Sequence, residues 1–157
     1  MKRFVTLCLF GLLCIFSNAQ TPRSIDVPLL ETDQEKENYL KQLVKNKRNL
    51  IGQPASEVYK ALKADGFPIR HMSTSTVGPW SQPDGIEYMT GVICFDKTIK
   101  EIEATNTAFL VTIELGLWVN DVDFWQNLPK HNWMEYIQKR TGNDIIQDIS
   151  YVKMRLH

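Results

Sequence analysis

A run of hydroxyl side chains beside a histidine is the closest that this sequence comes to a nucleophile with a base. His71 is followed by Ser73-Thr74-Ser75-Thr76. Serine hydrolases pair a serine with a histidine, and many place the serine in a Gly-x-Ser-x-Gly elbow, which this sequence lacks. We therefore expect no catalytic residue here, with His71 a structural histidine on a strand and the hydroxyl run in a loop. A small hydrolase with a triad assembled from distant residues remains as an alternative.

Only one cysteine follows the first 19 residues. Cys94 alternates with apolar residues in a segment typical of a strand. A cysteine in such a setting packs as a small hydrophobic residue, and burial keeps its thiol protonated. We predict that Cys94 is buried and inert.

No spacing in the sequence matches a known metal site. The histidines are His71, His131 and His157, which form no His-x-x-x-His pair. Asp121 and Asp123 are similar to the start of a calcium loop, but Gln126 stands where such a loop has glycine. Helix capping explains these aspartates, so we expect neither a metal ion nor another cofactor.

Trp80 is the candidate binding residue. It lies in a polar segment, Ser73 to Gly85, that contains several glycines and prolines and is predicted to be a loop. A tryptophan in such a loop either folds back over the sheet or anchors a protein or sugar partner. Arg70 and Met72 precede the loop and would extend such a surface. The predicted binding residues are therefore Trp80, Arg70 and Met72.

The first 19 residues have the pattern of a cleavable signal peptide. Lys2 and Arg3 precede an apolar run from Phe4 to Phe16, and Ser17-Asn18-Ala19 is a small-x-small cleavage site. The run is shorter than the roughly 20 residues that cross a membrane. Each cysteine in it follows a leucine, whereas a lipidated cysteine follows a small residue. We expect a secreted or periplasmic protein, cleaved near Ala19, with no membrane span after cleavage.

Cleavage would also change the charge of the chain. Without Lys2 and Arg3, the 18 basic side chains become 16 against 18 acidic ones, a net charge of −2. The one basic cluster, Lys45, Lys47 and Arg48, lies where a helix is predicted to end and where cations stabilise the helix dipole. We expect no nucleic-acid partner.

The predicted domain begins with two helices after an extended leader, residues 20–31. Thr32-Asp33-Gln34-Glu35 is a capping box that predicts a helix from residue 32 to about Asn49. Pro54 suits the first turn of a second helix, which would end at Gly66. Residues 32–157 contain neither a repeat nor a linker, so we predict one domain.

A sheet is predicted to follow the helices. Alternating apolar residues predict strands from Phe67, over 86–95, over 109–119 and over 145–154. Residues 98–104 suit a helical turn or a short strand, and we favour the strand. Short helices are predicted from Asp121 to Leu128 and from Trp133 to Gly142. The expected class is α+β, with two N-terminal helices, an antiparallel sheet of four to five strands and one or two short helices before the last strand.

One segment resembles a known pattern. Gly52-Gln53-Pro54-Ala55-Ser56-Glu57-Val58, followed by Leu62 and Gly66-Phe67-Pro68, resembles short uncharacterised secreted bacterial α+β proteins. Within residues 51–95 it is similar to outer-membrane assembly lipoprotein and beta-lactamase-inhibitor folds. Those folds pair two helices with a sheet and bind other proteins. The chain lacks their lipidated cysteine and their disulfide pairs, so the resemblance implies a protein-binding role without a particular partner.

Together these observations favour an exported, non-enzymatic module that binds another envelope or extracellular protein, of the inhibitor, immunity or envelope-assembly type. This hypothesis predicts an exposed apolar patch on the sheet or around Trp80. The alternative is a small-ligand or carbohydrate-binding protein, with a pocket lined by Trp80, Tyr88 or Trp118.

Overall fold

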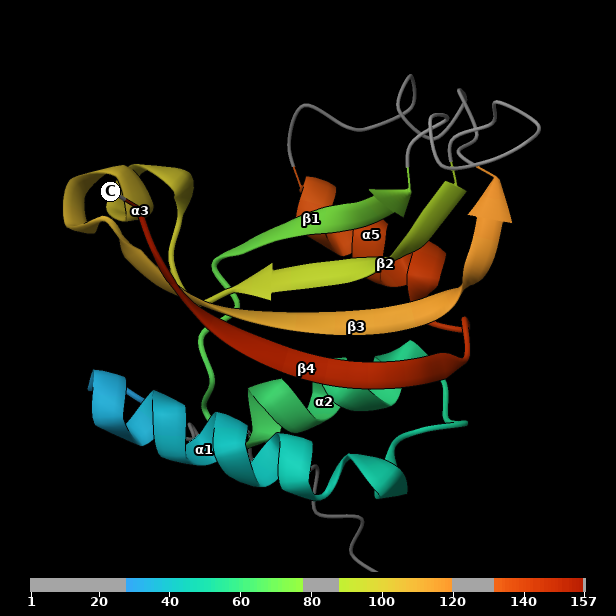
Figure 1. Cartoon of the computed structure of the whole chain (residues 1–157), viewed down its shortest axis with the longest axis horizontal. Coiled ribbons are helices and arrows are strands. Elements are labelled where there is room, and N and C mark those ends of the chain that lie inside the picture. Colours follow the sequence, from blue (N-terminus) through green and yellow to red (C-terminus); the bar gives the residue numbers. More distant parts are fainter. Residues whose placement is uncertain (1–27, 78–87, 120–131, 157) are drawn as a thin grey trace, which may run out of the picture.

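A four-stranded antiparallel sheet forms the centre of a computed structural model that describes residues 28–77, 88–119 and 132–156 (Figure 1). Its strands are β1 (His71–Val77), β2 (Tyr88–Phe95), β3 (Thr107–Val119) and β4 (Ile146–Arg155), and they lie in sequence order. Every neighbouring pair is antiparallel. The predicted α+β class and antiparallel sheet are confirmed.

The first helix, α1 (Asp33–Lys45), begins as the capping box predicts. The Thr32 hydroxyl accepts a hydrogen bond from the Glu35 N–H at 3.2 Å, and the Glu35 carboxylate accepts one from the Thr32 N–H at 2.9 Å. These bonds satisfy N–H groups that the first helical turn leaves without a partner. Leu40 and Leu43 then point into the core. A short 3₁₀ turn, Lys47–Asn49, follows α1.

The second helix, α2 (Ala55–Ala64), follows Pro54 and buries Val58 and Leu62 completely. It ends near Gly66, which has a φ of +76° and lies against the Pro28 carbonyl. Any other residue at this position would be strained, because L-residues rarely adopt this φ, and its Cβ would clash with that carbonyl. Gly66 therefore lets the chain turn sharply from α2 toward the sheet.

The first strand lies later in the sequence than predicted. Residues 67–70 precede it as a non-strand segment, and β1 extends through Val77. Ser73 and Thr74 pair with Ile93 and Val92 of β2, so the prediction that a loop begins at Ser73 is wrong. The polar composition of this stretch suits a strand at the edge of the sheet, where one face of the strand remains partly exposed. Sequence polarity alone did not distinguish that edge from a loop.

The predicted short strand over residues 98–104 is also wrong, because this stretch forms helix α3 (Ile99–Thr105). Thr98 and Glu101 form a second capping box, with the Thr98 N–H donating to the Glu101 carboxylate at 2.7 Å. Ile102 is buried, and Asn106 ends the helix in the left-handed conformation. The Thr-x-x-Glu pattern at residues 98–101 is a sequence signal for the start of this helix.

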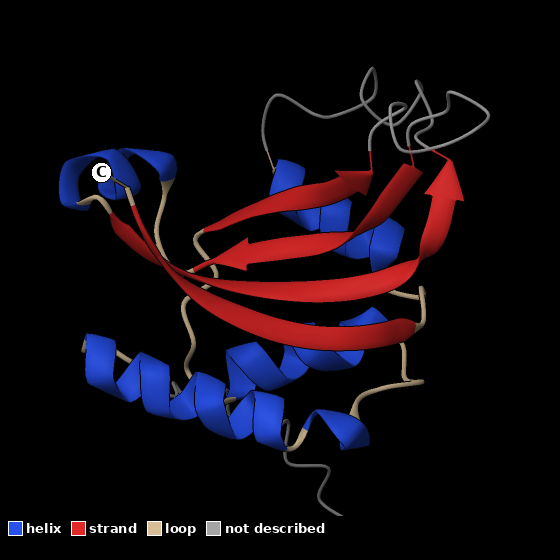
Figure 2. Ribbon diagram, viewed as in Figure 1, coloured by secondary structure: helices blue, strands red, loops and turns tan. Residues whose placement is uncertain are grey.

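The sheet has an inner face, which carries the main core, and an outer face. Inner-face residues on β3, with their neighbours on β2 and β4, are buried together: Val92, Cys94, Phe109, Val111, Ile113, Leu115 and Ile149. Residues of α1, α2 and α5 (Trp133–Thr141) belong to the same core, so these helices cover the inner face. Figure 2 shows α1 and α2 along one side of the sheet, with α5 behind β1. The predicted helix from Asp121 to Leu128 lies outside the described residues.

Candidate functional site

The outer face of the sheet carries a row of aligned side chains that crosses all four strands. His71 of β1 pairs with Phe95 of β2, Phe95 pairs with Leu110 of β3, and Leu110 pairs with Val152 of β4. We call these four residues the outer row. Side chains directly opposite one another on one face of a sheet lie within contact distance. The register thus joins three apolar side chains and one imidazole into a continuous strip.

The outer row is partly open to solvent. Val152 is 55% exposed, and Phe95 and Leu110 are partly buried. The adjacent row on this face consists of Ser73, Ile93, Thr112 and Ser150, all partly buried. At one end, the outer-face residue Ala108 and Ile102 of α3 are buried without belonging to the main core. The sheet therefore presents an apolar strip bordered by hydroxyl groups.

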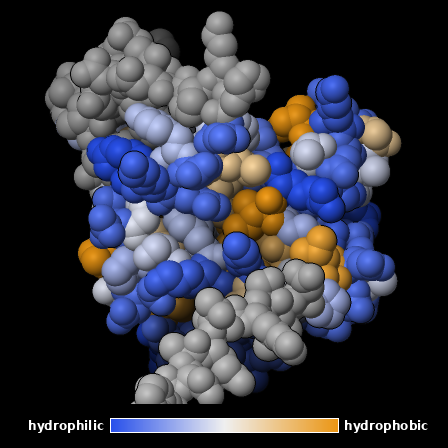
Figure 3. All heavy atoms as spheres, turned by 180° about the vertical axis from the view of Figure 1, so that it is seen from behind, coloured by the Kyte–Doolittle hydropathy of each residue, from blue (hydrophilic) through white to orange (hydrophobic). Residues whose placement is uncertain are grey.

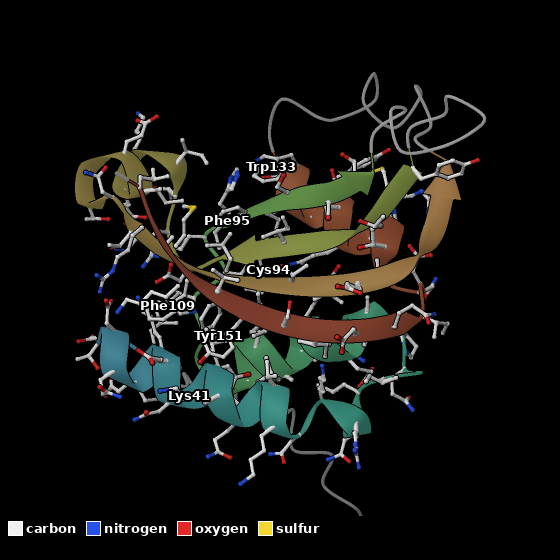
Figure 4. The ribbon with its side chains drawn as sticks, viewed as in Figure 1. Lys41, Cys94, Phe95, Phe109, Trp133 and Tyr151 are labelled. Atoms are coloured by element: carbon white, nitrogen blue, oxygen red, sulfur yellow. The ribbon has the colours of Figure 1, made fainter. Side chains whose placement is uncertain are left out.

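His71 lies at the β1 end of the outer row, between two aromatic rings. Its ring centre lies 5.1 Å from that of Phe95 and 4.6 Å from that of Trp133. Figure 4 labels these two neighbours, Phe95 on β2 and Trp133 on α5. Loss of solvent around the imidazole holds the pKa of His71 below its ordinary value of 6.5. His71 is therefore mainly neutral at pH 7, and the outer row carries no net charge. Its role as a structural histidine on a strand agrees with this packing.

A groove between α2 and the segment before β1 is the second candidate surface. Its volume is about 580 Å³, and we call it the α2 groove. It is lined by Leu29, Tyr59, Lys60, Lys63, Phe67, Pro68, Ile69, Arg70 and Gln138. Three of these residues are cationic and none is acidic. An apolar floor with a cationic rim favours an anionic ligand that also has an apolar part. Figure 3 shows that apolar patches also interrupt the mostly hydrophilic surface on the side facing away from the viewer of Figure 1.

Arg70 and Met72, two of the three predicted binding residues, lie in different environments in the structure. Arg70 is exposed and lines the α2 groove. Met72 is completely buried, and its sulfur accepts a hydrogen bond of 3.5 Å from Gln138 Nε2. Met72 therefore belongs to the core and cannot contact a partner at the surface. Trp80 lies outside the described residues, as do the side chain of Trp118 and the predicted capping residue Asp121.

The cations on α2 were missed by the sequence analysis. Lys60 and Lys63 are exposed and lie three residues apart, on the polar side of an amphipathic helix. Such lysines are common on helices and carry no signal by themselves. Only the fold places them beside Arg70 and the apolar segment that follows Gly66.

The environment of Cys94 agrees with the prediction that this cysteine is buried and inert. Its side chain is completely buried, and burial raises the pKa of the thiol to about 12. A thiol needs its thiolate form for nucleophilic attack, and this form is negligible at neutral pH here. Among residues 28–77, 88–119 and 132–156, no cluster of three or more His, Cys, Asp or Glu side chains is arranged to hold a metal ion.

A buried ion pair lies close to the α2 groove. Lys36 Nζ is 2.8 Å from Asp96 Oδ2. A smaller cavity of about 370 Å³ contacts this pair and also Leu29, Pro68 and Arg70, which the α2 groove shares. The smaller cavity contains both acids and bases, so its charges compensate one another. The α2 groove differs because its cations are not balanced by acids in its lining.

Comparison of the chain with protein-family models, with curated proteins and with solved structures finds no match. The fold defines an α+β protein whose antiparallel sheet has helices on its inner face. None of the helices that the structure describes has the length and apolar character needed to cross a membrane.

Proposed function

We propose that the protein is exported and that its mature chain, residues 20–157, binds another protein through the outer face of the sheet without catalysing a reaction. The observation that carries this proposal is the outer row, His71-Phe95-Leu110-Val152, which is continuous across four strands and partly open to solvent. Helices α1 and α2 pack on the inner face, whereas α5 contacts this row only at its His71 end, through Trp133.

The chemistry of the outer face suits a protein surface. Phe95 and Leu110 offer apolar area whose removal from water stabilises a complex by about 25 cal/mol per Å². Ser73, Thr112 and Ser150 lie beside them and supply hydroxyl groups for hydrogen bonds. An apolar centre with polar groups around it is the usual arrangement at protein interfaces.

The proposal of export rests on the first 19 residues. The signal-peptide pattern at residues 1–19 addresses the chain to the secretory route. The resemblance of residues 51–95 to folds that bind other proteins supports an inhibitor, immunity or envelope-assembly role. A partner would then be an envelope or extracellular protein.

Site-specific photo-crosslinking tests the proposal. A photoreactive amino acid replaces Val152 in the full-length protein, produced in its own cells, and a matched variant carries it at Lys45, which is exposed on α1. We expect one discrete adduct with an envelope protein from position 152 and none from position 45. Adding Leu110→Asp to the first variant should abolish the adduct, with circular dichroism reporting that the fold is retained. The same adducts from both positions, or none from position 152, would contradict the proposal.

A further inference from the structure

We propose that the α2 groove binds an extended acidic segment of the partner protein, with one apolar side chain of that segment on the groove floor. This inference rests on the protein-binding function proposed above and names the chemistry of the segment that is recognised.

The charges of the groove are the first argument. Lys60 and Lys63 approach it from α2, and Arg70 approaches it from the segment before β1. Lys60 pairs with Glu57 at 2.7 Å, but both side chains are exposed and such pairs are weak. Neither Lys63 nor Arg70 forms an ion pair with another described residue. Glu57 and Glu101 interact with Lys60 and Arg70, but neither acid lines the groove. The groove lining is therefore cationic in a mature chain whose predicted net charge is negative.

The apolar lining is the second argument. Phe67 and Pro68 are buried, Ile69 is partly buried, and Leu29 is 52% exposed at the edge of the groove. A volume of about 580 Å³ accommodates a few side chains rather than a folded domain. An apolar floor together with cationic side chains at the rim fits a peptide segment in which a leucine or phenylalanine is flanked by aspartate or glutamate.

The backbone beside the groove favours a peptide over a fatty acid. The Phe67 N–H donates to the Leu62 carbonyl, and the Arg70 N–H donates to the Phe95 carbonyl. Among the backbone hydrogen bonds of the described residues outside helices and strands, none has the Ile69 N–H as its donor, so this group has no backbone acceptor there. A peptide carbonyl provides such an acceptor. Cations on two different segments also match several carboxylates, whereas a fatty acid has one.

A peptide titration followed by NMR tests this inference. The mature protein, labelled with ¹⁵N, is titrated with hexapeptides in which one Leu or Phe is flanked by Asp and Glu, and with matched peptides that carry Asn and Gln instead. We expect the acidic peptides to shift the amide signals of Lys63, Ile69 and Arg70, and the neutral peptides to bind about tenfold more weakly. Arg70→Gln and Lys63→Gln should each weaken binding about threefold or more, because each removes a cation from a partly desolvated site. Lys45→Gln, on α1, should leave binding unchanged.

Three results would overturn the inference. The first is equal binding of the acidic and neutral peptides, or no binding of either. The second is a shift of the same signals by hexadecanoate when the peptides give none. The third is binding that appears only after deletion of residues 20–27, which would make the chain's own segment before Pro28 the occupant. If the adduct from position 152 forms while the acidic peptides fail, the α2 groove assignment alone is rejected. Absence of the adduct from position 152 rejects the protein-binding function through the outer face, whatever the peptides do.

Discussion

Lys36 of α1 donates a hydrogen bond of 2.8 Å from Nζ to Asp96 Oδ2, and both side chains are withdrawn from solvent, with exposed fractions of 9% and 0%. The other carboxylate oxygen, Asp96 Oδ1, accepts a hydrogen bond of 2.8 Å from the Phe109 N–H. One carboxylate thus joins α1, the end of β2 and the first part of β3. This bond network fixes α1 over the sheet beside the segment that carries Arg70.

Loss of either member of this pair should destabilise the protein strongly. Asp96→Ala leaves the Lys36 ammonium and the Phe109 N–H buried without their acceptor, and Lys36→Met leaves the carboxylate without its cation. Each change should lower the free energy of unfolding by about 3–5 kcal/mol, measured by urea denaturation. The double variant should lose less than the sum of the two, because the second change removes a charge that the first left unpaired. Additive losses would show that the two side chains do not interact.

Cys94 should resist alkylation in the folded protein. Its thiol is completely buried and has a pKa raised to about 12, so almost no thiolate is accessible at pH 8. Iodoacetamide should modify the mature protein only after urea is added, as followed by intact mass. As a positive control, a Lys45→Cys variant should gain one adduct without urea. Rapid modification of Cys94 in the native protein would mean that this strand opens readily.

Tyr59 and Thr141 connect α2 to α5 through a hydrogen bond of 2.7 Å between their hydroxyls. Tyr59→Phe should lower the free energy of unfolding by about 1 kcal/mol, because the Thr141 hydroxyl keeps its bond to the Ile137 carbonyl. Thr141→Val removes both bonds and leaves the Tyr59 hydroxyl buried without a partner, so it should cost about 1–3 kcal/mol. Thermal and urea unfolding of the two variants measure the difference. Equal losses would contradict this assignment of the bonds.

His71 should make stability depend on pH in mildly acidic solution. Burial lowers the pKa of His71 below 6.5, so on acidification the unfolded chain takes up a proton before the folded one does. The free energy of unfolding should therefore fall as the pH drops through 6.5 toward the lower pKa of the folded state. His71→Gln should reduce this dependence between pH 7.5 and 5.5, whereas His131→Gln serves as the comparison. An unchanged profile for His71→Gln would show that the imidazole is fully solvated.

Gly91 and Gly116 offer a matched pair of glycines in the sheet. A methyl group at Gly91 would collide with the Ile113 carbonyl, whereas one at Gly116 would meet no atom of the described residues within 4 Å. Gly91→Ala should cost about 2 kcal/mol or more, because β2 and β3 must separate locally. Gly116→Ala should be neutral within about 0.5 kcal/mol. Urea denaturation of both variants gives the comparison, and similar values for the two would contradict the close approach of the strands at Gly91.

The local features that depend on neighbouring residues were predictable from the sequence. The capping box at Thr32 began α1, and the alternation over residues 109–119 gave a strand with one buried face. Both signals act over a few residues, so no tertiary contact is needed to interpret them. The prediction failed at residues 98–104, where the spacing of Ile99 and Ile102 suits either a helical turn or a strand and the capping box of Thr98 and Glu101 was not considered.

Contacts between distant segments of the chain could be identified only from the tertiary structure. The sequence by itself determined the single thiol beyond residue 19, the α+β class and most of the helices and strands, because these depend on composition and on short-range periodicity. The export signal stays a prediction from the same kind of pattern. Only the folded chain placed His71, Phe95, Leu110 and Val152 in one row and brought Lys60 and Lys63 to Arg70. Strand register and the packing of α2 decide these positions. Both result from the whole core, which no short stretch of sequence specifies.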